Sequence, residues 1–243
     1  MAALIDLNAD LGEGIGDDLS MLKIVTSASI ACGGHAGNAQ TMRAAVRGAQ
    51  ANGVRIGAHP GFEDPDNFGR LRLDLPFETI RDQVLAQIAR LASIAAEEGA
   101  PISYLKLHGA LANMAAEDEA LSHAVFAGVA RAYPGLAILA LAASAQESAA
   151  KQLGLPVIAE AYADRAYRPD GLLAARSLPG GVIEDTAAVV ARCLRLAEQG
   201  EIIAINGTAF KSDARSICLH GDTSGALEHA RAVRDALRSR NLM

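Results

Sequence analysis

The sequence contains no tryptophan, and aromatic residues make up only 4% of its 243 residues. Proteins that stack bases on aromatic rings need more of them, so this composition argues against such a binding surface. The 22 basic residues are scattered along the chain and are outnumbered by 28 acidic ones, which gives a net charge of −6. Nucleic-acid binding normally requires a basic patch. We therefore expect no nucleic-acid partner.

Cysteine and long apolar segments are equally scarce. Cys32, Cys193 and Cys218 form an odd set without CxxC spacing, which predicts neither a disulfide framework nor a thiolate zinc site. The first residues lack the basic and apolar regions of a signal peptide. Apolar runs such as residues 136–143 are too short to cross a bilayer. These features predict a cytoplasmic protein with no membrane partner.

Apolar residues nevertheless make up 51% of the chain, enough for a sizeable core. Short β-type runs alternate with longer helical patterns from end to end. The predicted strands are Ala3–Leu7, Ala28–Cys32, Val54–Ala58, Ser103–Leu107, Leu136–Leu141, Pro156–Glu160 and Ser216–Leu219, with a further hairpin strand at Glu201–Ile205. The predicted helices are Asn38–Ala51, Pro76–Glu98, Glu117–Arg131, Ser144–Leu153, Glu184–Gln199 and Thr223–Arg240.

Alternation of this kind is typical of βαβ units and a parallel sheet. Right-handed crossovers would close the sheet into an α/β barrel of about seven or eight strands, with an open doubly wound sheet as the alternative. Nothing divides the chain, so we expect one domain over residues 1–243. The least regular stretch, Pro60 to Asp74, is predicted to be an active-site loop.

Polar residues follow the predicted strands again and again. In a parallel barrel these positions share the face that carries catalysis. Four of the six histidines lie there, each within two residues of a glycine. The segments concerned are Asp6–Gly14, Cys32–His35, Gly57–Gly61, Lys106–Gly109, Glu160–Arg165 and His220–Asp222.

This set of side chains suits hydrolytic or acid/base chemistry. Neutral histidines and carboxylates can bind a divalent metal that activates water, or a His–carboxylate pair can act as a general base without metal. Asp6 and Asn8 alternate, so both are predicted to point into the barrel. Lys106, one of four lysines, is suited to an oxyanion, a carboxylate or a phosphate. Asp222 is predicted either to cap the last helix or to take part in catalysis.

Other features have simpler interpretations. The pair Asp17-Asp18 is most simply negative charge at a helix N-terminus. The glycines at 12, 14 and 16 only weakly resemble a phosphate loop, and no Walker motif occurs in the sequence. Burial is a better expectation for Cys32 than a role as a nucleophile.

Several long motifs strongly resemble the LamB/YcsF family, in the same order and over nearly the whole chain. They are the segments 6–14, 29–37, 56–62, 67–70, 106–111, 163–167, 170–171 and 218–222. The resemblance implies an irregular (β/α) barrel similar to glycoside hydrolases and polysaccharide deacetylases. It also implies the A subunit of an ATP-dependent 5-oxoprolinase, which opens the 5-oxoproline lactam to L-glutamate together with partner subunits B and C.

On this basis we assign expected roles to individual residues. The expected catalytic residues are Asp10, Glu13, His35, His59, Lys106 and His108. The expected substrate-binding residues are Asn8, Arg70, Asp164, Arg165, His220 and Asp222. ATP is the expected co-substrate. A divalent metal is a further candidate cofactor, with Asp6, His35 and His59 as candidate ligands.

The sequence departs from the family's pattern at three positions. Gly34, Leu107 and Ala112 stand where the family has Phe, Pro and Tyr. Loss of two aromatic rings predicts a larger pocket, so a larger lactam is an alternative substrate. A metal-dependent deacetylase or amidohydrolase, and a non-catalytic substrate-binding protein, are the alternative functions. The Ala-rich helical faces leave a homo-oligomer open as well.

Overall fold

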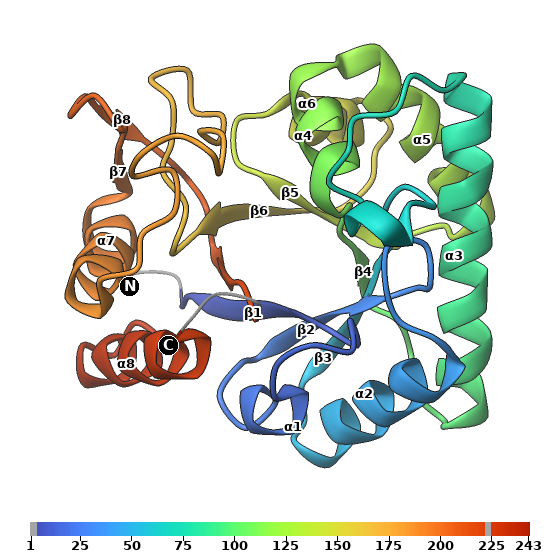
Figure 1. The fold of residues 1–243 in the computed structure, drawn as a ribbon, viewed down its shortest axis with the longest axis horizontal. Coiled ribbons are helices and arrows are strands. Elements are labelled where there is room, and N and C mark those ends of the chain that lie inside the picture. The colour runs from blue at the N-terminus through green and yellow to red at the C-terminus, as the bar shows by residue number, and fades with distance from the viewer. Residues whose placement is uncertain (1–3, 222–224) are drawn as a thin grey trace.

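The computed structural model describes residues 4–221 and 225–243. Seven parallel strands close into a barrel in the order β1-β2-β3-β4-β5-β6-β9 (Figure 1). This confirms the predicted α/β barrel and excludes the open sheet. The strands are β1 (Asp6–Leu11), β2 (Ser27–Ala31), β3 (Arg55–His59), β4 (Tyr104–Leu105), β5 (Ala137–Leu141), β6 (Val157–Tyr162) and β9 (Ser216–Leu219).

The barrel closes where the first strand meets the last. In β1, Asp6 to Ala9 pair in register with Ser216 to Leu219 of β9. Just outside this pairing, the Ile5 backbone N–H donates to the Leu242 carbonyl at 2.7 Å. The two ends of the described chain therefore lie close together at the seam.

Helices surround the barrel (Figure 1). They are α1 (Asp18–Met21), α2 (Ala39–Ala51), α3 (Phe77–Glu97), α4 (Gly109–Glu117), α5 (Glu119–Ala132), α6 (Ala145–Gln152), α7 (Thr186–Gln199) and α8 (Ala226–Ser239), with a short 3₁₀ turn at Pro65–Asn67. The expected cap is present: Asn38 forms a capping box with Thr41. Asp17, expected as negative charge at a helix N-terminus, caps α1 by accepting from the Ser20 N–H. Helix α4 was not predicted, and it begins directly after His108.

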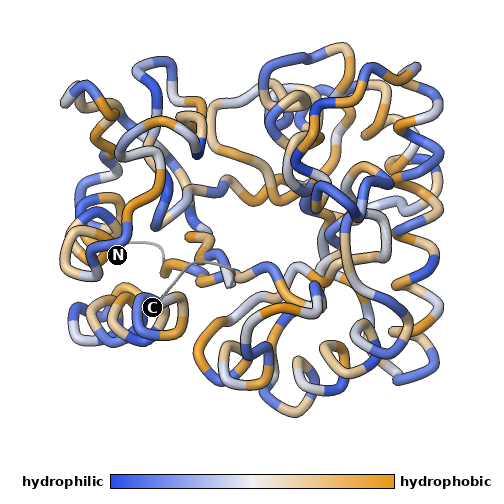
Figure 2. Tube along the Cα trace, in the orientation of Figure 1, coloured by the Kyte–Doolittle hydropathy of each residue, from blue (hydrophilic) through white to orange (hydrophobic). Residues whose placement is uncertain are grey.

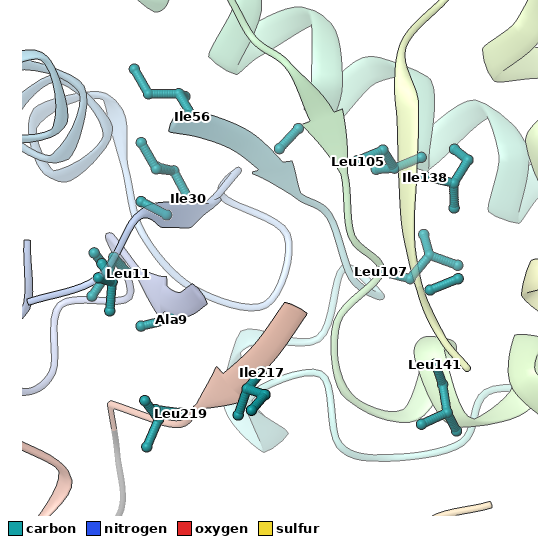
Figure 3. Close-up of a cluster of buried hydrophobic side chains, with 14 of the residues drawn as sticks. Ala9, Leu11, Ile30, Ile56, Leu105, Leu107, Ile138, Leu141, Ile217 and Leu219 are labelled. Atoms are coloured by element: carbon teal, nitrogen blue, oxygen red, sulfur yellow. The ribbon is translucent and has the colours of Figure 1, made fainter. Parts of the chain in front are cut away.

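The core lies between the barrel and the helices rather than inside the barrel. On β1 the outward residues Leu7, Ala9 and Leu11 are buried against this layer, as are Ile30 of β2 and Ile56 of β3 (Figure 3). Hydrophobic and hydrophilic residues accordingly alternate along the outer helices (Figure 2). Burial of such side chains is the main favourable term in folding.

The barrel interior is unusually polar. The inward residues of β1 are Asp6, Asn8 and Asp10, alternating with the apolar ones because successive side chains of a strand point to opposite faces. Tyr104 fills the interior beside Gly57, where a Cβ would lie 2.2 Å from the tyrosine ring. Its hydroxyl is 3.2 Å from Ser29 Oγ. Polar side chains thus form the inner layers that most barrels build from Val, Ile and Leu.

The first strand differs from its prediction. It begins at Asp6, three residues later than expected, and runs to Leu11. The apolar Leu4 is 65% exposed and precedes the strand. The later end places Asp10 inside the strand, where it faces the barrel interior together with Asn8, instead of in the loop that follows. The predicted hairpin is confirmed as β7 (Glu201–Ile203) paired antiparallel with β8 (Ala209–Lys211).

None of the helices in the described part of the chain is both long and apolar enough to cross a membrane.

The three cysteines are free and buried. Burial raises the pKa of Cys32 and of Cys193 to about 12, and it also raises the pKa of Cys218. Since the thiolate is the reactive form, a thiol reagent such as Ellman's reagent is expected to modify none of them in the folded protein and all three in denaturant. Rapid labelling of Cys32 in the folded protein, located by peptide mapping, would contradict this expectation and support a role for Cys32 as a nucleophile.

Candidate active site

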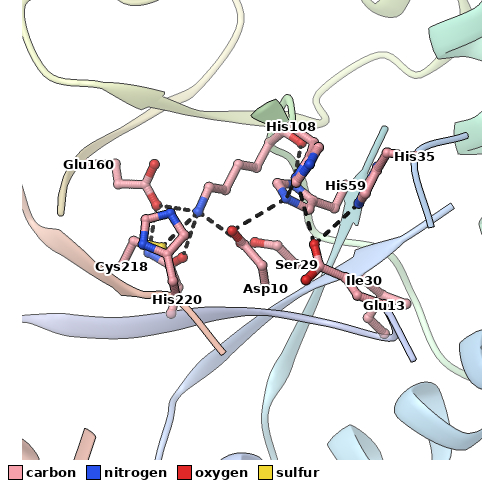
Figure 4. Close-up of polar contacts among 12 residues, drawn as sticks. Asp10, Glu13, Ser29, Ile30, His35, His59, His108, Glu160, Cys218 and His220 are labelled. Atoms are coloured by element: carbon pink, nitrogen blue, oxygen red, sulfur yellow. Dashed lines mark hydrogen bonds and ion pairs between the residues drawn. The ribbon is translucent and has the colours of Figure 1, made fainter. Parts of the chain in front are cut away.

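A cavity of about 580 Å³ opens at the C-terminal ends of the barrel strands. Its lining comes from several strands and from the loops that follow them, as the catalytic face of a (β/α) barrel predicts. The titratable groups that line it include Asp10, Glu13, His59, His108, Tyr162 and His220. Figure 4 shows histidines and carboxylates from widely separated parts of the chain converging at this end of the barrel.

Beneath the cavity floor, Lys106 forms a buried ionic network. Its Nζ lies 2.9 Å from both Asp10 Oδ1 and Glu160 Oε1, and 3.0 Å from Cys218 Sγ. Burial opposes the charge on Lys106, but the attraction of the Asp10 and Glu160 carboxylates outweighs it, so the pKa of Lys106 lies well above its usual value. Burial likewise opposes ionisation of Asp10, yet His59 and Lys106 hold its pKa well below the usual range. The network therefore keeps an ionised carboxylate at the cavity floor.

Asn8 belongs to this network and not to the cavity wall. Its amide nitrogen donates to Glu160 Oε1 at 2.9 Å and to Ser216 Oγ at 2.8 Å. The side chain is fully buried, and its Oδ1 accepts from Lys106 at 3.3 Å. The predicted substrate contact is therefore wrong: Asn8 positions Glu160 and Lys106.

Three histidines and a glutamate form a second cluster beside Asp10. Glu13 Oε1 lies 3.2 Å from His35 Nε2 and 3.7 Å from His108 Nδ1. His59 Nε2 lies 3.0 Å from His108 Nδ1 and 3.4 Å from Asp10 Oδ2. The rings of His35 and His108 stack with centroids 3.5 Å apart. All six residues expected to be catalytic are thus joined by direct contacts.

Burial, reinforced by neighbouring histidines, disfavours positive charge in this cluster. It lowers the pKa of His35 to about 3 and the pKa of His108 well below its usual value. Both rings are therefore neutral near pH 7, the state in which imidazole nitrogen acts as a ligand or a base.

On the other side of Asp10, His220 forms a hydrogen-bonded pair with Asp164. The His220 Nδ1 is 2.8 Å from Asp164 Oδ1, and the ring stacks on Tyr162 at 5.3 Å. Asp164 is 1% exposed, so it orients His220 instead of contacting substrate as predicted. A histidine held by a buried aspartate is a common arrangement for a general base.

Arginines surround the upper wall of the cavity. Arg70 lies with its guanidinium over the Phe68 ring at 5.0 Å and lines the cavity, consistent with its predicted substrate contact. Arg165 also lines the cavity, but its guanidinium donates to the Ala174 and Gly181 carbonyls. Arg165 therefore holds the following loop in place as well as contributing charge. Arg72, Arg168 and Arg176 add to the basic lining.

Asp6 does not join the histidines as a metal ligand. It lies at the opposite end of β1, where its carboxylate accepts from Thr26, Ser27 and Ser216 and pairs with Arg55 at 2.9 Å. The prediction is wrong because residues 6 and 10 of one strand lie two inward layers apart. Asp222 lies outside the described residues.

The glycine-rich segment that weakly resembles a phosphate loop already uses one of its backbone N–H groups inside the protein. The Gly12 N–H donates to the Asp18 carboxylate at 2.9 Å, which uses one of the donors that a phosphate would need.

Of the three departures from the family pattern, Gly34 does not enlarge the cavity. A Cβ at Gly34 would lie 2.3 Å from Gln87 Oε1, so the missing side chain makes room for Gln87 of α3. Gln87 in turn bonds both backbone groups of Gly61, at 3.2 Å and 2.8 Å, and so fixes the loop after His59. Ala112, where the family has Tyr, lines the cavity, and so does Leu107.

The sequence placed the segment Glu160–Arg165 on the catalytic face but predicted no individual role for Glu160 or Tyr162, and it missed Cys218. They lie within β6 and β9, where the alternation Glu160-Tyr162-Asp164 and Ser216-Cys218-His220 places polar groups on the inward face. That period of two was the available signal. It is easily missed because the polar residues that follow the strands are the more conspicuous ones.

The barrel and this cavity define the class of the protein: a (β/α) barrel whose catalytic face carries groups for hydrolytic chemistry. The LamB/YcsF family model matches residues 5–243. The chain therefore belongs to the LamB/YcsF family, which confirms the resemblance seen in the sequence.

Solved structures agree with this assignment. A lactam utilization protein from Thermus thermophilus is 39% identical, with a TM-score of 0.92 over 98% of this chain and 97% of that one. A GH113 β-1,4-mannanase is 10% identical, with a TM-score of 0.55 over 98% and 100% of the two chains. A GH20 β-N-acetylhexosaminidase from Streptomyces coelicolor A3(2) is 14% identical, with a TM-score of 0.50 over 97% and 64%. The last two share the fold alone, which confirms the glycoside hydrolase-like barrel.

Proposed function

We propose that the protein is the A subunit of an ATP-dependent 5-oxoprolinase and binds and opens the lactam within an assembly with subunits B and C. The observation that carries this proposal is the full-length similarity to the T. thermophilus lactam utilization protein, at 39% identity over 98% of the chain. The cavity supports it, because cationic and acid/base groups are combined at its wall and floor.

The chemistry explains why ATP is needed. A lactam amide is a poor electrophile, and transfer of the γ-phosphoryl group to its oxygen gives an imidate-like species. Water then attacks the former carbonyl carbon, the carbon–nitrogen bond of the ring breaks, and the nitrogen takes up a proton, which leaves an acyl phosphate. A second water hydrolyses the acyl phosphate and releases the phosphate. The products are glutamate, ADP and phosphate.

The described residues can divide this work. Arg70 at the cavity wall would bind the substrate carboxylate or the transferred phosphate. His220, oriented by Asp164, would accept a proton from the attacking water and return it to the leaving nitrogen. Lys106 does not line the cavity, so it acts through Asp10.

The test is a coupled assay for glutamate formed from 5-oxoproline by this chain alone, with ATP, and with ATP and subunits B and C. Glutamate only in the complete mixture is the expected result. No glutamate with partners proven active beside another A subunit would overturn the proposed substrate. A larger lactam would then be the substrate to test, because Ala112, which stands where the family has Tyr, lines the cavity.

One observation favours a second candidate, a metal-dependent amide hydrolase that acts alone. Glu13, His35, His59 and His108 each place a potential ligand atom within 4.8 Å of the others. Hydrolysis of an amide without ATP, abolished by a chelator, would select this function over the first.

A further inference from the structure

The backbone fixes the protonation of two ring nitrogens in the histidine cluster. His59 Nδ1 lies 2.9 Å from the Lys106 carbonyl oxygen, and His108 Nε2 lies 3.0 Å from the Phe68 carbonyl oxygen. A carbonyl oxygen only accepts hydrogen bonds, so each of these nitrogens carries a hydrogen. In a neutral ring the other nitrogen then presents a lone pair.

The two lone pairs face each other. His59 Nε2 and His108 Nδ1 are 3.0 Å apart, and both are acceptors when the two rings are neutral. A carboxylate oxygen, Glu13 Oε1, lies 3.7 Å from the same His108 nitrogen. Electron-rich atoms that converge in this way repel each other unless a cation lies among them. One shared proton would bridge only two of them.

We propose that Glu13, His35, His59 and His108 bind one divalent transition metal ion of the zinc class. Ligands about 2.0–2.2 Å from a tetrahedral zinc ion are about 3.3 Å from each other. The contacts within the cluster, 3.0 Å, 3.2 Å and 3.7 Å, bracket this spacing. Three imidazoles and one carboxylate favour zinc, cobalt or nickel over magnesium or calcium, which prefer oxygen ligands.

The surroundings of the cluster support the assignment. Ring N–H groups of metal-binding histidines usually donate to a carbonyl or carboxylate, as those of His59 and His108 do here. Gly69 packs on the cluster: a Cβ there would lie 2.7 Å from His35 Cβ and 3.1 Å from the His108 ring. The proposed ion would face the cavity, because Glu13, His59 and His108 line it.

His35 is the weakest of the four ligands. Its Nδ1 is buried and has no hydrogen-bond partner among residues 4–221 and 225–243, so no outer contact fixes its tautomer. Removal of the His35 ring is therefore expected to lower the affinity for the metal less than removal of the His59 or His108 ring.

The test is metal binding by the purified full chain after dialysis against a chelator, followed by titration with Zn²⁺ and Co²⁺. We expect one ion per chain and a Co²⁺ visible spectrum typical of tetrahedral nitrogen and oxygen ligands, a readout that needs no variant. His59→Gln and His108→Gln are expected to weaken binding about 100-fold or more. His123→Gln, at an exposed helical position, is the matched control and should leave binding unchanged.

His220→Gln is a second control, because His220 lies with Asp10 and Cys218 in a separate group of potential ligands. Three results would overturn the proposal: less than about one tenth of an ion per chain with zinc, cobalt and nickel; unchanged affinity in His59→Gln and His108→Gln; or loss of binding in His220→Gln alone. Histidine NMR that finds one proton shared by His59 and His108 at saturating metal would also overturn it. Since no turnover is measured, failure here is distinct from failure of the proposed function.

Discussion

Replacing Lys106 with methionine is expected to abolish turnover and to lower the free energy of unfolding by about 3–5 kcal/mol. The substitution keeps the length of the side chain but leaves the buried carboxylates of Asp10 and Glu160 without their shared cation. Loss of Lys106 is therefore expected to lower stability as well as activity. Urea unfolding monitored by circular dichroism gives the stability, and the coupled glutamate assay gives the activity.

The sign of the pH effect follows from the two pKa shifts. The pKa of Asp10 is lowered on folding. Its contribution to the free energy of unfolding is therefore present above about pH 4 and is lost as the pH falls through the pKa of the folded state. The pKa of Lys106 is raised, so its contribution is present below about pH 10 and is lost at higher pH. The stability difference between wild type and Lys106→Met should therefore be largest between these limits.

Two further variants separate charge from packing. Lys211→Met changes a lysine that is 77% exposed, and it should alter the free energy of unfolding by less than about 0.5 kcal/mol. Lys106→Met combined with Glu160→Gln removes one of the stranded charges and should recover part of the stability but not the activity. If Lys106→Met is as stable as wild type, the charge of Lys106 does not stabilise the buried carboxylates, and this prediction is wrong.

Changing Asp164 to asparagine is expected to lower kcat by about 10²–10⁴-fold. The amide can no longer hold the His220 ring with its Nδ1 hydrogen toward residue 164, so the ring nitrogen at the cavity loses its basic tautomer. The KM for the lactam should change little, because Asp164 is buried beneath His220 and does not line the cavity. Steady-state kinetics of the complete ATP-dependent mixture separate kcat from KM.

Non-additivity gives the sharper test of this pair. If Asp164 acts through His220, the double variant Asp164→Asn/His220→Gln should be no slower than His220→Gln alone. Asp235→Asn, whose carboxylate is 67% exposed, is the matched control and should leave kcat unchanged. If the fold-losses in kcat of the two single variants multiply in the double variant, the two side chains act separately.

The sequence predicted the barrel well because its strongest signals are local. The strand-to-helix alternation and the cap at Asn38 depend only on neighbouring residues, and both are present in the structure. The start of β1 was misplaced because Leu4 and Ile5 look like strand residues, whereas the alternation from Asp6 to Leu11 carries the true register. In this barrel the apolar face of a strand looks outward to the helices, so a polar residue is no sign that the strand has ended.

The site was predictable as a set of residues and not as a set of contacts. His35, His59 and His108 were identified because each follows a strand, and a parallel barrel brings strand ends together. The pairing of His220 with Asp164, and the burial of Asn8 beneath Lys106, depend on which strands are neighbours around the closed sheet. The order of the strands around the barrel cannot be predicted from a local sequence pattern.

The seam between β1 and β9 has a consequence for biosynthesis. Asn8 and Asp10 are synthesised long before Ser216, Cys218 and His220, although the two strands are neighbours in the barrel. The nascent chain must therefore keep one edge of β1 unpaired until β9 has emerged, and contacts of such long sequence separation form slowly. Competence for catalysis should appear in a single late step, and chains released early should lack it altogether.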